Sequence, residues 1–257
     1  MYYILYFVNK YIIITARCNS SRLKNKILKK ITKKYKSIDI LIKRAQKTNY
    51  PICLATSNNK SDDKLVNYVK KNYNIDIFRG SENNKVLRWA NCIKKFSIDY
   101  AALVDGDDLA FDYTIYDSCL TKIKKNQRST VFKFPKKIVT GSFTYIFDSK
   151  SIKLINKKSG KLKKIDVIEF FLRYLNNIRE IKVPKILLDK KIRLTLDYKD
   201  DLKFFRALYK RVSILEKTTK IVEFLQKNGN IRKLNYHLEE SWRKNQLKEV
   251  DLHEKTN

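Results

Sequence analysis

The sequence predicts an α/β fold with a mainly parallel central sheet, and two patterns support that prediction. Short runs rich in isoleucine, leucine and valine alternate with stretches whose apolar residues recur at helical spacing. The first four apolar runs all end in polar residues, and parallel sheets bind ligands beyond the carboxyl ends of their strands. At 257 residues and 43% hydrophobic content, the chain can bury a sizeable core.

The chain is strongly basic, with a formal net charge of +31. Its cations are spread along the whole length, so we expect general attraction for anionic substrates and no specific nucleic-acid recognition. Four widely spaced cysteines favour reduced thiols over a metal knuckle or a disulfide framework. No run of about 18 apolar residues occurs, which predicts no membrane span, and we expect a cytoplasmic protein.

The first expected strand, at residues 11–14, leads into a polar loop. This loop carries three cations and two serines, namely Arg17, Ser20, Ser21, Arg22 and Lys26. The three cations could converge on one anion such as a phosphate, with the serines as supporting donors. A solvated loop of a very basic protein is the alternative, and the spacing alone does not exclude it.

Two further strands follow, each with a polar end. A helical pattern over 38–45 precedes a strand at 51–56, and a short strand at 75–78 precedes a helical pattern over 84–96. Asp62 and Asp63 are predicted to cap the helix after the second strand, with ligand contact as the alternative.

The fourth strand, at residues 100–104, ends in an acidic cluster. Asp105, Asp107 and Asp108 follow it, with Gly106 between the first two acids. Carboxylates at one strand end can hold a hard divalent cation such as Mg²⁺, and the glycine lets a phosphate approach the backbone. An acidic turn is the alternative, but acids are few in this chain and their clustering favours a metal.

Weaker patterns continue the chain after the acidic cluster. They predict helices over 113–126 and 165–175 and strands over 130–134, 143–147 and 191–197. The last strand ends in Asp197. Either Asp197 or Asp200 would cap the next helix, and the alternative for Asp197 is a role as second metal ligand. Without a Gly- or Pro-rich linker, residues 10–212 are predicted to form one catalytic unit. Residues 213–257 would be a helical appendage that covers the core or a partner subunit in a homodimer.

Several short blocks, taken together, give the chain a family resemblance. They are Ala16-Arg17 with Ser20 to Leu23 and Lys26, Ala55-Thr56-Ser57 with Asp62-Asp63, Phe78 to Glu82 with Val86 to Trp89, Gly106-Asp107, and Arg193 to Asp197 with Asp201. In this order they resemble the cytidylyltransferases that make CMP-activated sugars. The likeness is to the spore coat polysaccharide biosynthesis protein F group, which is related to the 3-deoxy-manno-octulosonate and acylneuraminate cytidylyltransferases.

The resemblance implies a nucleotide-diphospho-sugar transferase-like fold, with a mixed, mainly parallel sheet. It implies that Arg17, Arg22 and Lys26 neutralise the triphosphate of CTP. Asp107 and Asp197 would hold the Mg²⁺ cofactor. Further substrate-binding candidates are the ends of the second and third strands, at Ala55, Thr56, Ser57, Arg79 and Gly80.

The implied reaction transfers CMP from CTP to an acidic or amino sugar for a surface polysaccharide. A sugar hydroxyl would attack the α-phosphorus in line while pyrophosphate leaves, and positioning and electrostatics would supply most of the rate. A glycosyltransferase of similar fold is the alternative, because Asp105-Gly106-Asp107 could also grip the diphosphate of a nucleotide-sugar.

The chain departs from the family pattern at two places. Lys24-Asn25 stands where the family usually has Pro-Gly, and Asp108-Leu109-Ala110 stands where a proline normally follows the metal-binding acid. The first change is expected to alter the rigidity of the loop more than its charge. The second lies beside the expected metal site, where it would shift the sugar pocket or reduce activity.

Overall fold

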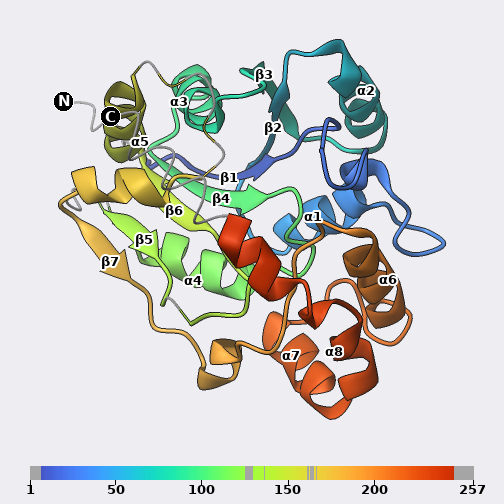
Figure 1. Ribbon diagram of the computed structural model, residues 1–257. Coiled ribbons are helices and arrows are strands. Elements are labelled where there is room, and N and C mark those ends of the chain that lie inside the picture. Colours follow the sequence, from blue (N-terminus) through green and yellow to red (C-terminus); the bar gives the residue numbers. More distant parts are fainter. Residues whose placement is uncertain are drawn as a thin grey trace, which may run out of the picture.

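The computed structural model describes residues 7–124, 130–135, 137–160, 162, 165 and 167–245. Within them, one sheet runs in the order β3-β2-β1-β4-β6-β5-β7 (Figure 1). Its strands are β1 (Lys10–Thr15), β2 (Ile52–Ser57), β3 (Asp76–Gly80), β4 (Tyr100–Asp105), β5 (Val131–Lys133), β6 (Tyr145–Asp148) and β7 (Ile178–Glu180).

The sheet is mixed and mainly parallel, which confirms the predicted fold class. β1 pairs in parallel with both β2 and β4, and β2 pairs in parallel with β3. β6 runs antiparallel to β4 and β5, whereas β5 and β7 are parallel. The carboxyl ends of β1 to β4 therefore lie along one edge, where their polar loops meet.

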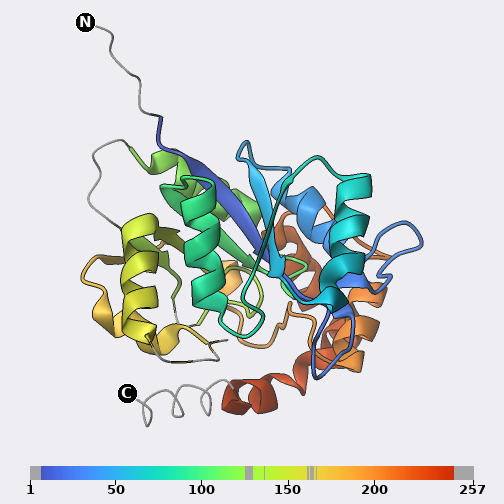
Figure 2. The same cartoon turned by 90° about the horizontal axis from the view of Figure 1, so that it is seen from above.

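Helices cover both faces of the sheet (Figure 2). The described helices are α1 (Ser37–Ala45), α2 (Asp63–Asn72), α3 (Lys85–Lys95), α4 (Tyr113–Lys122), α5 (Ser149–Ser159), α6 (Lys199–Leu208), α7 (Thr218–Lys227) and α8 (Gly229–Tyr236). Short 3-10 helices join them, namely η1 (Lys26–Leu28), η2 (Lys60–Asp62), η3 (Glu169–Tyr174) and η4 (Lys185–Leu188). No helix in the described ranges is long and apolar enough to cross a membrane.

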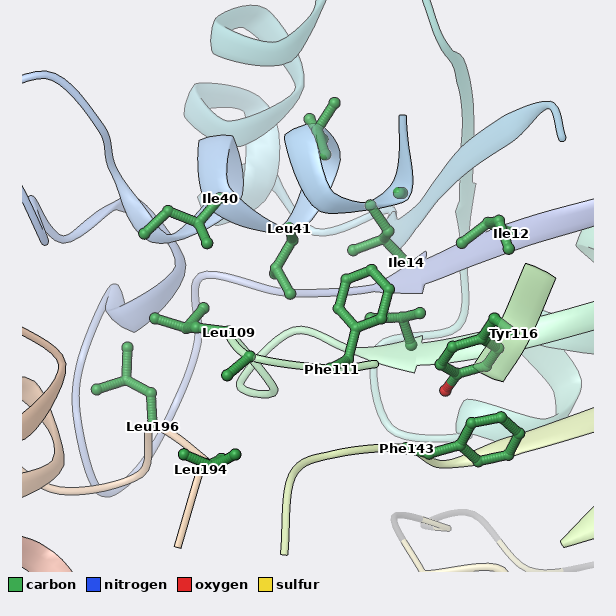
Figure 3. Close-up of a cluster of buried hydrophobic side chains, with 14 of the residues drawn as sticks. Ile12, Ile14, Ile40, Leu41, Leu109, Phe111, Tyr116, Phe143, Leu194 and Leu196 are labelled. Carbon is green, nitrogen blue, oxygen red and sulfur yellow. The ribbon is translucent and has the colours of Figure 1, made fainter. Parts of the chain in front are cut away.

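Successive side chains of β1 enter two different cores, as the alternation of a strand requires. Ile12 and Ile14 pack with α1 and α4 on one face (Figure 3). Ile13 points to the other face, where it joins residues of α3 and α5. Because both faces are covered, the middle of the strand is apolar on both sides, and this explains the unbroken isoleucine run at residues 12–14.

Two predicted elements have a different form in the structure. The helix expected over 165–175 is the short 3-10 helix η3. The strand expected over 191–197 is extended chain with a single bridge, between Thr140 and Arg193. Its amides turn to different segments, since Leu194 N–H donates to Thr140 O at 2.8 Å and Leu196 N–H donates to Asp107 O at 2.9 Å. No continuous ladder can therefore form along it.

The C-terminal helices are tied to the sheet region by one buried arginine. Arg44 of α1 donates to the carbonyl oxygens of Phe111, Ile214 and Glu216 and to the hydroxyl of Thr218. Its side chain is fully buried, so these acceptors replace its lost hydration. The chain after residue 212 therefore packs directly on the predicted catalytic unit, and the division into 10–212 and 213–257 stays a prediction.

The strand ends of β1 and β4 meet at a glycine, which gives a test of the packing. Gly106 N–H donates to Thr15 O at 2.8 Å, and a Cβ at this position would lie 2.8 Å from Ala16 Cβ. We expect Gly106→Ala to lower the free energy of unfolding by about 1–3 kcal/mol in urea titrations. The control is Gly229→Ala, where nothing lies within 4 Å of the added Cβ. Equal effects of the two substitutions would contradict the close approach.

Candidate functional site

Two acids 90 positions apart in the sequence meet at the carboxyl edge of the sheet. Asp107 follows β4, and Asp197 lies at the end of the extended segment before α6. The hydrogen bond from Leu196 N–H to Asp107 O, at 2.9 Å, holds the two segments side by side. The structure therefore brings together the two predicted metal ligands.

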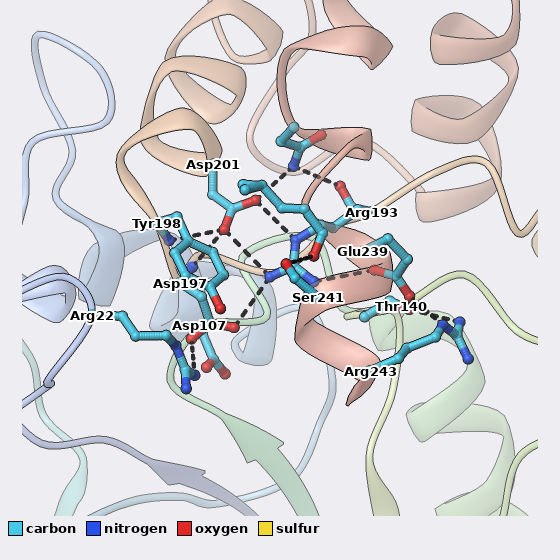
Figure 4. Close-up of polar contacts among 12 residues, drawn as sticks. Arg22, Asp107, Thr140, Arg193, Asp197, Tyr198, Asp201, Glu239, Ser241 and Arg243 are labelled. Atoms are coloured by element: carbon cyan, nitrogen blue, oxygen red, sulfur yellow. Dashed lines mark hydrogen bonds and ion pairs between the residues drawn. The ribbon is translucent and has the colours of Figure 1, made fainter. Parts of the chain in front are cut away.

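Lys26 joins these two acids. Its Nζ lies 2.7 Å from Asp107 Oδ2 and 2.9 Å from Asp197 Oδ1. Arg22 Nη2 also contacts Asp197 Oδ1, at 2.7 Å (Figure 4). Two of the three predicted phosphate-binding cations thus converge on one point, beside the two predicted metal ligands.

A left-handed residue places Lys26 in this position. Asn25 has φ 56° and ψ 30°, and its N–H donates to Cys18 O at 3.1 Å. Apart from glycine, asparagine is one of the residues that adopt this conformation most readily. Asn25 can therefore make the turn that the family usually makes with glycine, and η1 begins directly after it.

The second departure from the family pattern also has a local explanation. Leu109 belongs to the segment that stands in place of the expected proline, and its N–H donates to Asp107 O at 3.0 Å. Its side chain is fully buried in the core. A backbone hydrogen bond and an apolar anchor therefore fix the turn after Asp107, where a proline ring would fix it by restricting φ.

A buried arginine supports Asp197 from behind. Arg193 contacts Asp197 Oδ2 at 3.2 Å, Asp201 Oδ1 at 3.0 Å and Glu239 Oε2 at 3.1 Å, and its side chain is fully buried (Figure 4). Asn235 of α8 also donates to Asp201 Oδ1, at 2.9 Å. Two residues of the C-terminal helical region, Asn235 and Glu239, thus help to hold the site.

Asp201, rather than Asp197, caps α6. Its Oδ2 accepts hydrogen bonds from the backbone N–H groups of Asp197 and Tyr198, at 2.8 and 2.9 Å. The carboxylate of Asp197 is directed instead to the cations described above. Of the two roles predicted for Asp197, the structure therefore disfavours capping.

The cations around Asp197 set its ionisation. Burial acts to raise the pKa of Asp197, but the charges and hydrogen bonds of Lys26 and Arg22 outweigh it and hold that pKa well below its usual range. For Lys26, burial acts in the opposite direction, and the charges of Asp107 and Asp197 still raise its pKa. Asp197 and Lys26 thus stabilise each other's charged forms.

The acidic cluster after β4 offers further oxygen ligands. Carboxylate oxygens of Asp105, Asp107 and Asp108 all lie within 4.8 Å of one another. Asp105 is paired with Lys85 Nζ at 2.5 Å. Burial, reinforced by the charges of Asp107 and Asp105, raises the pKa of Asp108 well above its usual value. Burial raises the pKa of Asp107 as well. Asp107 and Asp197 stay the predicted pair for a divalent cation, and hard carboxylate oxygens on two segments would fit Mg²⁺.

Arg17 lies apart from the other two cations of its loop. Its Nη1 donates to Glu82 O at 2.6 Å, on the loop after β3. Neighbouring backbone contacts explain this, since Ala16 N–H donates to Ala55 O and Cys18 N–H donates to Asp62 Oδ1. The loop therefore starts beside β2 and returns to β4 only later. Convergence of Arg17 with Arg22 and Lys26 on one substrate anion therefore stays a prediction.

Asp62 has a role that the sequence did not reveal. Its carboxylate is fully buried and accepts hydrogen bonds from Cys18 N–H at 2.6 Å and Thr56 Oγ1 at 3.0 Å, and also from Ser57 Oγ. It makes no side-chain cap to α2, so the predicted capping role is wrong. The only hint of this role in the sequence is the pair of hydroxyl residues, Thr56 and Ser57, that end β2 and donate to Asp62. Asp62 instead fastens the start of the cationic loop to β2.

Most of the remaining predicted substrate residues lie around Asp62, at the ends of β2 and β3. Ala55, Thr56 and Ser57 are fully buried at the end of β2. Arg79 binds the loop after β2, through Ser57 O at 3.0 Å, Asn59 O at 2.8 Å and the carboxylate of Asp63 at 2.6 Å. Gly80 ends β3 beside them, with its carbonyl oxygen accepting from Asn58 N–H. Ser20 is half-buried and Ser21 exposed.

Comparison with known proteins gives a consistent result. The family model described as cytidylyltransferase matches residues 11–246. An uncharacterised protein of Methanocaldococcus jannaschii is 29% identical over 229 residues, which cover 87% of this chain and 93% of that protein.

Solved structures share the fold. A cytidylyltransferase from Leptospira borgpetersenii superposes with a TM-score of 0.79 at 22% identity, covering 88% of this chain and 97% of its own. A CMP:2-keto-3-deoxy-manno-octonic acid synthetase, solved in complex with CTP, gives a TM-score of 0.59 at 16% identity, over 79% of this chain and 99% of its own. At these identities the likeness establishes the fold, which is the one that the sequence predicted.

The contact between Arg193 and the C-terminal region can be tested with adjacent glutamates. Glu239→Gln removes a charge that accepts from Arg193, Thr140 and Arg243. We expect it to lower the free energy of unfolding by about 2 kcal/mol, because the buried guanidinium loses a charged partner. Glu240→Gln is the control, since Glu240 is 81% exposed and pairs only across the surface with Lys244. Urea unfolding measures both, and an unchanged midpoint for Glu239→Gln would refute the role.

Proposed function

The chain belongs to the cytidylyltransferase family, and we propose that it transfers CMP from CTP to an acidic or amino sugar in the synthesis of a surface polysaccharide. It is a nucleotidyltransferase by family. The observation that carries the proposal is the position of Lys26, between Asp107 and Asp197 with Arg22 beside it. A triphosphate substrate needs cationic side chains and a pair of metal-binding acids within reach of one another, and these four residues would supply both.

The proposed reaction is an in-line displacement at the α-phosphorus of CTP. A sugar hydroxyl oxygen forms a new bond to phosphorus, the bond from that phosphorus to the β-phosphate oxygen breaks, and the hydroxyl proton is released. The products are the CMP-sugar and pyrophosphate. Negative charge builds on the phosphate oxygens, so the barrier depends mainly on positioning and on nearby positive charge.

The residues of the site divide this work. Lys26 and Arg22 would bind the β- and γ-phosphates and stabilise the leaving pyrophosphate. Asp107 and Asp197 would hold Mg²⁺, and bound Mg²⁺ would supply further charge stabilisation to the phosphates. Arg193 keeps the carboxylate of Asp197 in place through its own contacts with Asp201 and Glu239.

The nucleoside is assigned to the ends of β2 and β3. The hydroxyls of Thr56 and Ser57 donate to Asp62, so we assign to Ala55 and its neighbours a backbone role toward cytosine and ribose. The segment at Arg79-Gly80 borders the same region. Arg17 is held beside this segment, because its Nη1 donates to Glu82 O on the loop after β3. Ser20 and Ser21 would add donors to the phosphates from the loop.

Activity measurements test the metal-binding acids. With CTP, Mg²⁺ and a panel of acidic and amino sugars, pyrophosphate release should identify a substrate. Asp107→Ala should then reduce turnover by at least about a hundredfold, because a divalent cation loses one of its two main ligands. The exposed acid Glu240 provides the control, as Glu240→Gln should keep full activity. Turnover retained by Asp107→Ala would refute the metal assignment.

Thermal stability separates this function from that of a glycosyltransferase. CTP with Mg²⁺ at about 100 times its dissociation constant should stabilise the protein by about 2.7 kcal/mol, which corresponds to a rise in Tm of several degrees. UDP-sugars at the same concentration should give a clearly smaller shift. A larger shift with UDP-sugars would favour a glycosyltransferase and contradict the proposal.

A further inference from the structure

The two oxygens of Asp197 are held by different kinds of cation. Oδ2 contacts Arg193, whose side chain is fully buried and is also tied to Asp201 and Glu239. Oδ1 contacts Lys26 and Arg22, which come from the loop after β1 and keep 13% and 36% of their side chains exposed. One oxygen therefore has a fixed partner and the other has partners that can leave.

Lys26 occupies the place that a divalent cation would need. Its Nζ is within 2.9 Å of one oxygen of each acid in the proposed metal-binding pair. An ammonium this close competes with a divalent cation for the lone pairs of these oxygens and repels it. Metal binding through Asp107 and Asp197 is therefore favoured when the ammonium moves away.

The ammonium can move without the backbone. The peptide groups of Lys26 are held by Leu23 O, which accepts from its N–H at 3.1 Å, and by Ser37 Oγ, which donates to its carbonyl oxygen at 2.8 Å. Four methylenes separate the Nζ from this fixed backbone, so rotation of the side chain redirects the charge. Phosphate oxygens are suitable new partners.

We propose that Lys26, assisted by Arg22, is an exchangeable counter-ion for Asp107 and Asp197, which leaves them when a divalent cation binds and then binds the phosphates of the substrate. Metal and triphosphate consequently bind cooperatively. The metal replaces Lys26 as the partner of the two acids, and the phosphates become the new partner of the displaced ammonium. Arg193 remains on Asp197 throughout. The identity of the two ligands rests on the proposed function.

Titration with Mn²⁺, followed by electron paramagnetic resonance of the free ion, tests the competition without any catalysis. Lys26→Met should bind Mn²⁺ about tenfold more tightly than the parent protein in the absence of nucleotide, a change of about 1.4 kcal/mol. Lys24→Met is the control, because Lys24 is an exposed cation of the same loop and should leave the affinity nearly unchanged. Arg22→Met, which frees the same oxygen of Asp197, should give a smaller gain in the same direction.

A second background separates competition from general charge repulsion. In Asp197→Asn, Lys26 has lost one of its two carboxylate partners, so adding Lys26→Met should raise the Mn²⁺ affinity much less than in the parent. An equal gain in both backgrounds would show that Lys26 acts only through its long-range charge, and would overturn the proposal. Unchanged or weaker Mn²⁺ binding by both Lys26→Met and Arg22→Met, with Tm values close to that of the parent, would overturn it too.

The cooperativity is measured with tripolyphosphate, corrected for the Mn²⁺ that this ion binds in free solution. Tripolyphosphate should tighten Mn²⁺ binding to the parent protein. In Lys26→Met, the factor by which tripolyphosphate increases the Mn²⁺ affinity should be about ten times smaller. Equal coupling in parent and variant would contradict the exchange. Because this probe contains no nucleoside or sugar, these results are independent of pyrophosphate release. An absence of CTP-dependent turnover would refute the proposed function and leave the counter-ion exchange standing.

Discussion

The charge balance at Asp197 is the constraint on which the site depends. This carboxylate is almost completely buried, and an isolated charge in such a place would be strongly destabilising. Arg193 balances it from inside the protein, and Lys26 and Arg22 balance it from the loop. The same contacts fix the loop after β1, the turn after β4 and the start of α6 relative to one another. The proposed site is thus kept assembled by the same charges that we propose to bind the substrate.

The C-terminal region contributes to the site through this balance. Glu239 accepts from the buried Arg193, and Asn235 donates to Asp201, which in turn holds the backbone of Asp197. The C-terminal region, which the sequence predicts to be a covering appendage, therefore contributes partners to Arg193 and Asp201, the residues that hold Asp197. The family match, which extends to residue 246, is consistent with that participation.

The two departures from the family pattern preserve geometry by other means. Asn25 adopts the left-handed conformation for which glycine is the usual choice, so Lys26 is still delivered to the acids. Leu109 closes the turn after Asp107 with a backbone hydrogen bond and a buried side chain. Both positions therefore have a local means of holding the backbone without the residues that are typical of the family.

The sequence by itself determined the parallel half of the sheet and placed Asp107 directly after a strand end, because strand and helix periodicities are local and survive in a single sequence. It failed where the outcome depended on distant partners. The segment before Asp197 forms no strand, since its amides bond to two other segments, and Asp62 is buried and does not cap α2. Only the tertiary structure decided which charges meet, because an ion pair between residues far apart leaves no periodic signal in the chain.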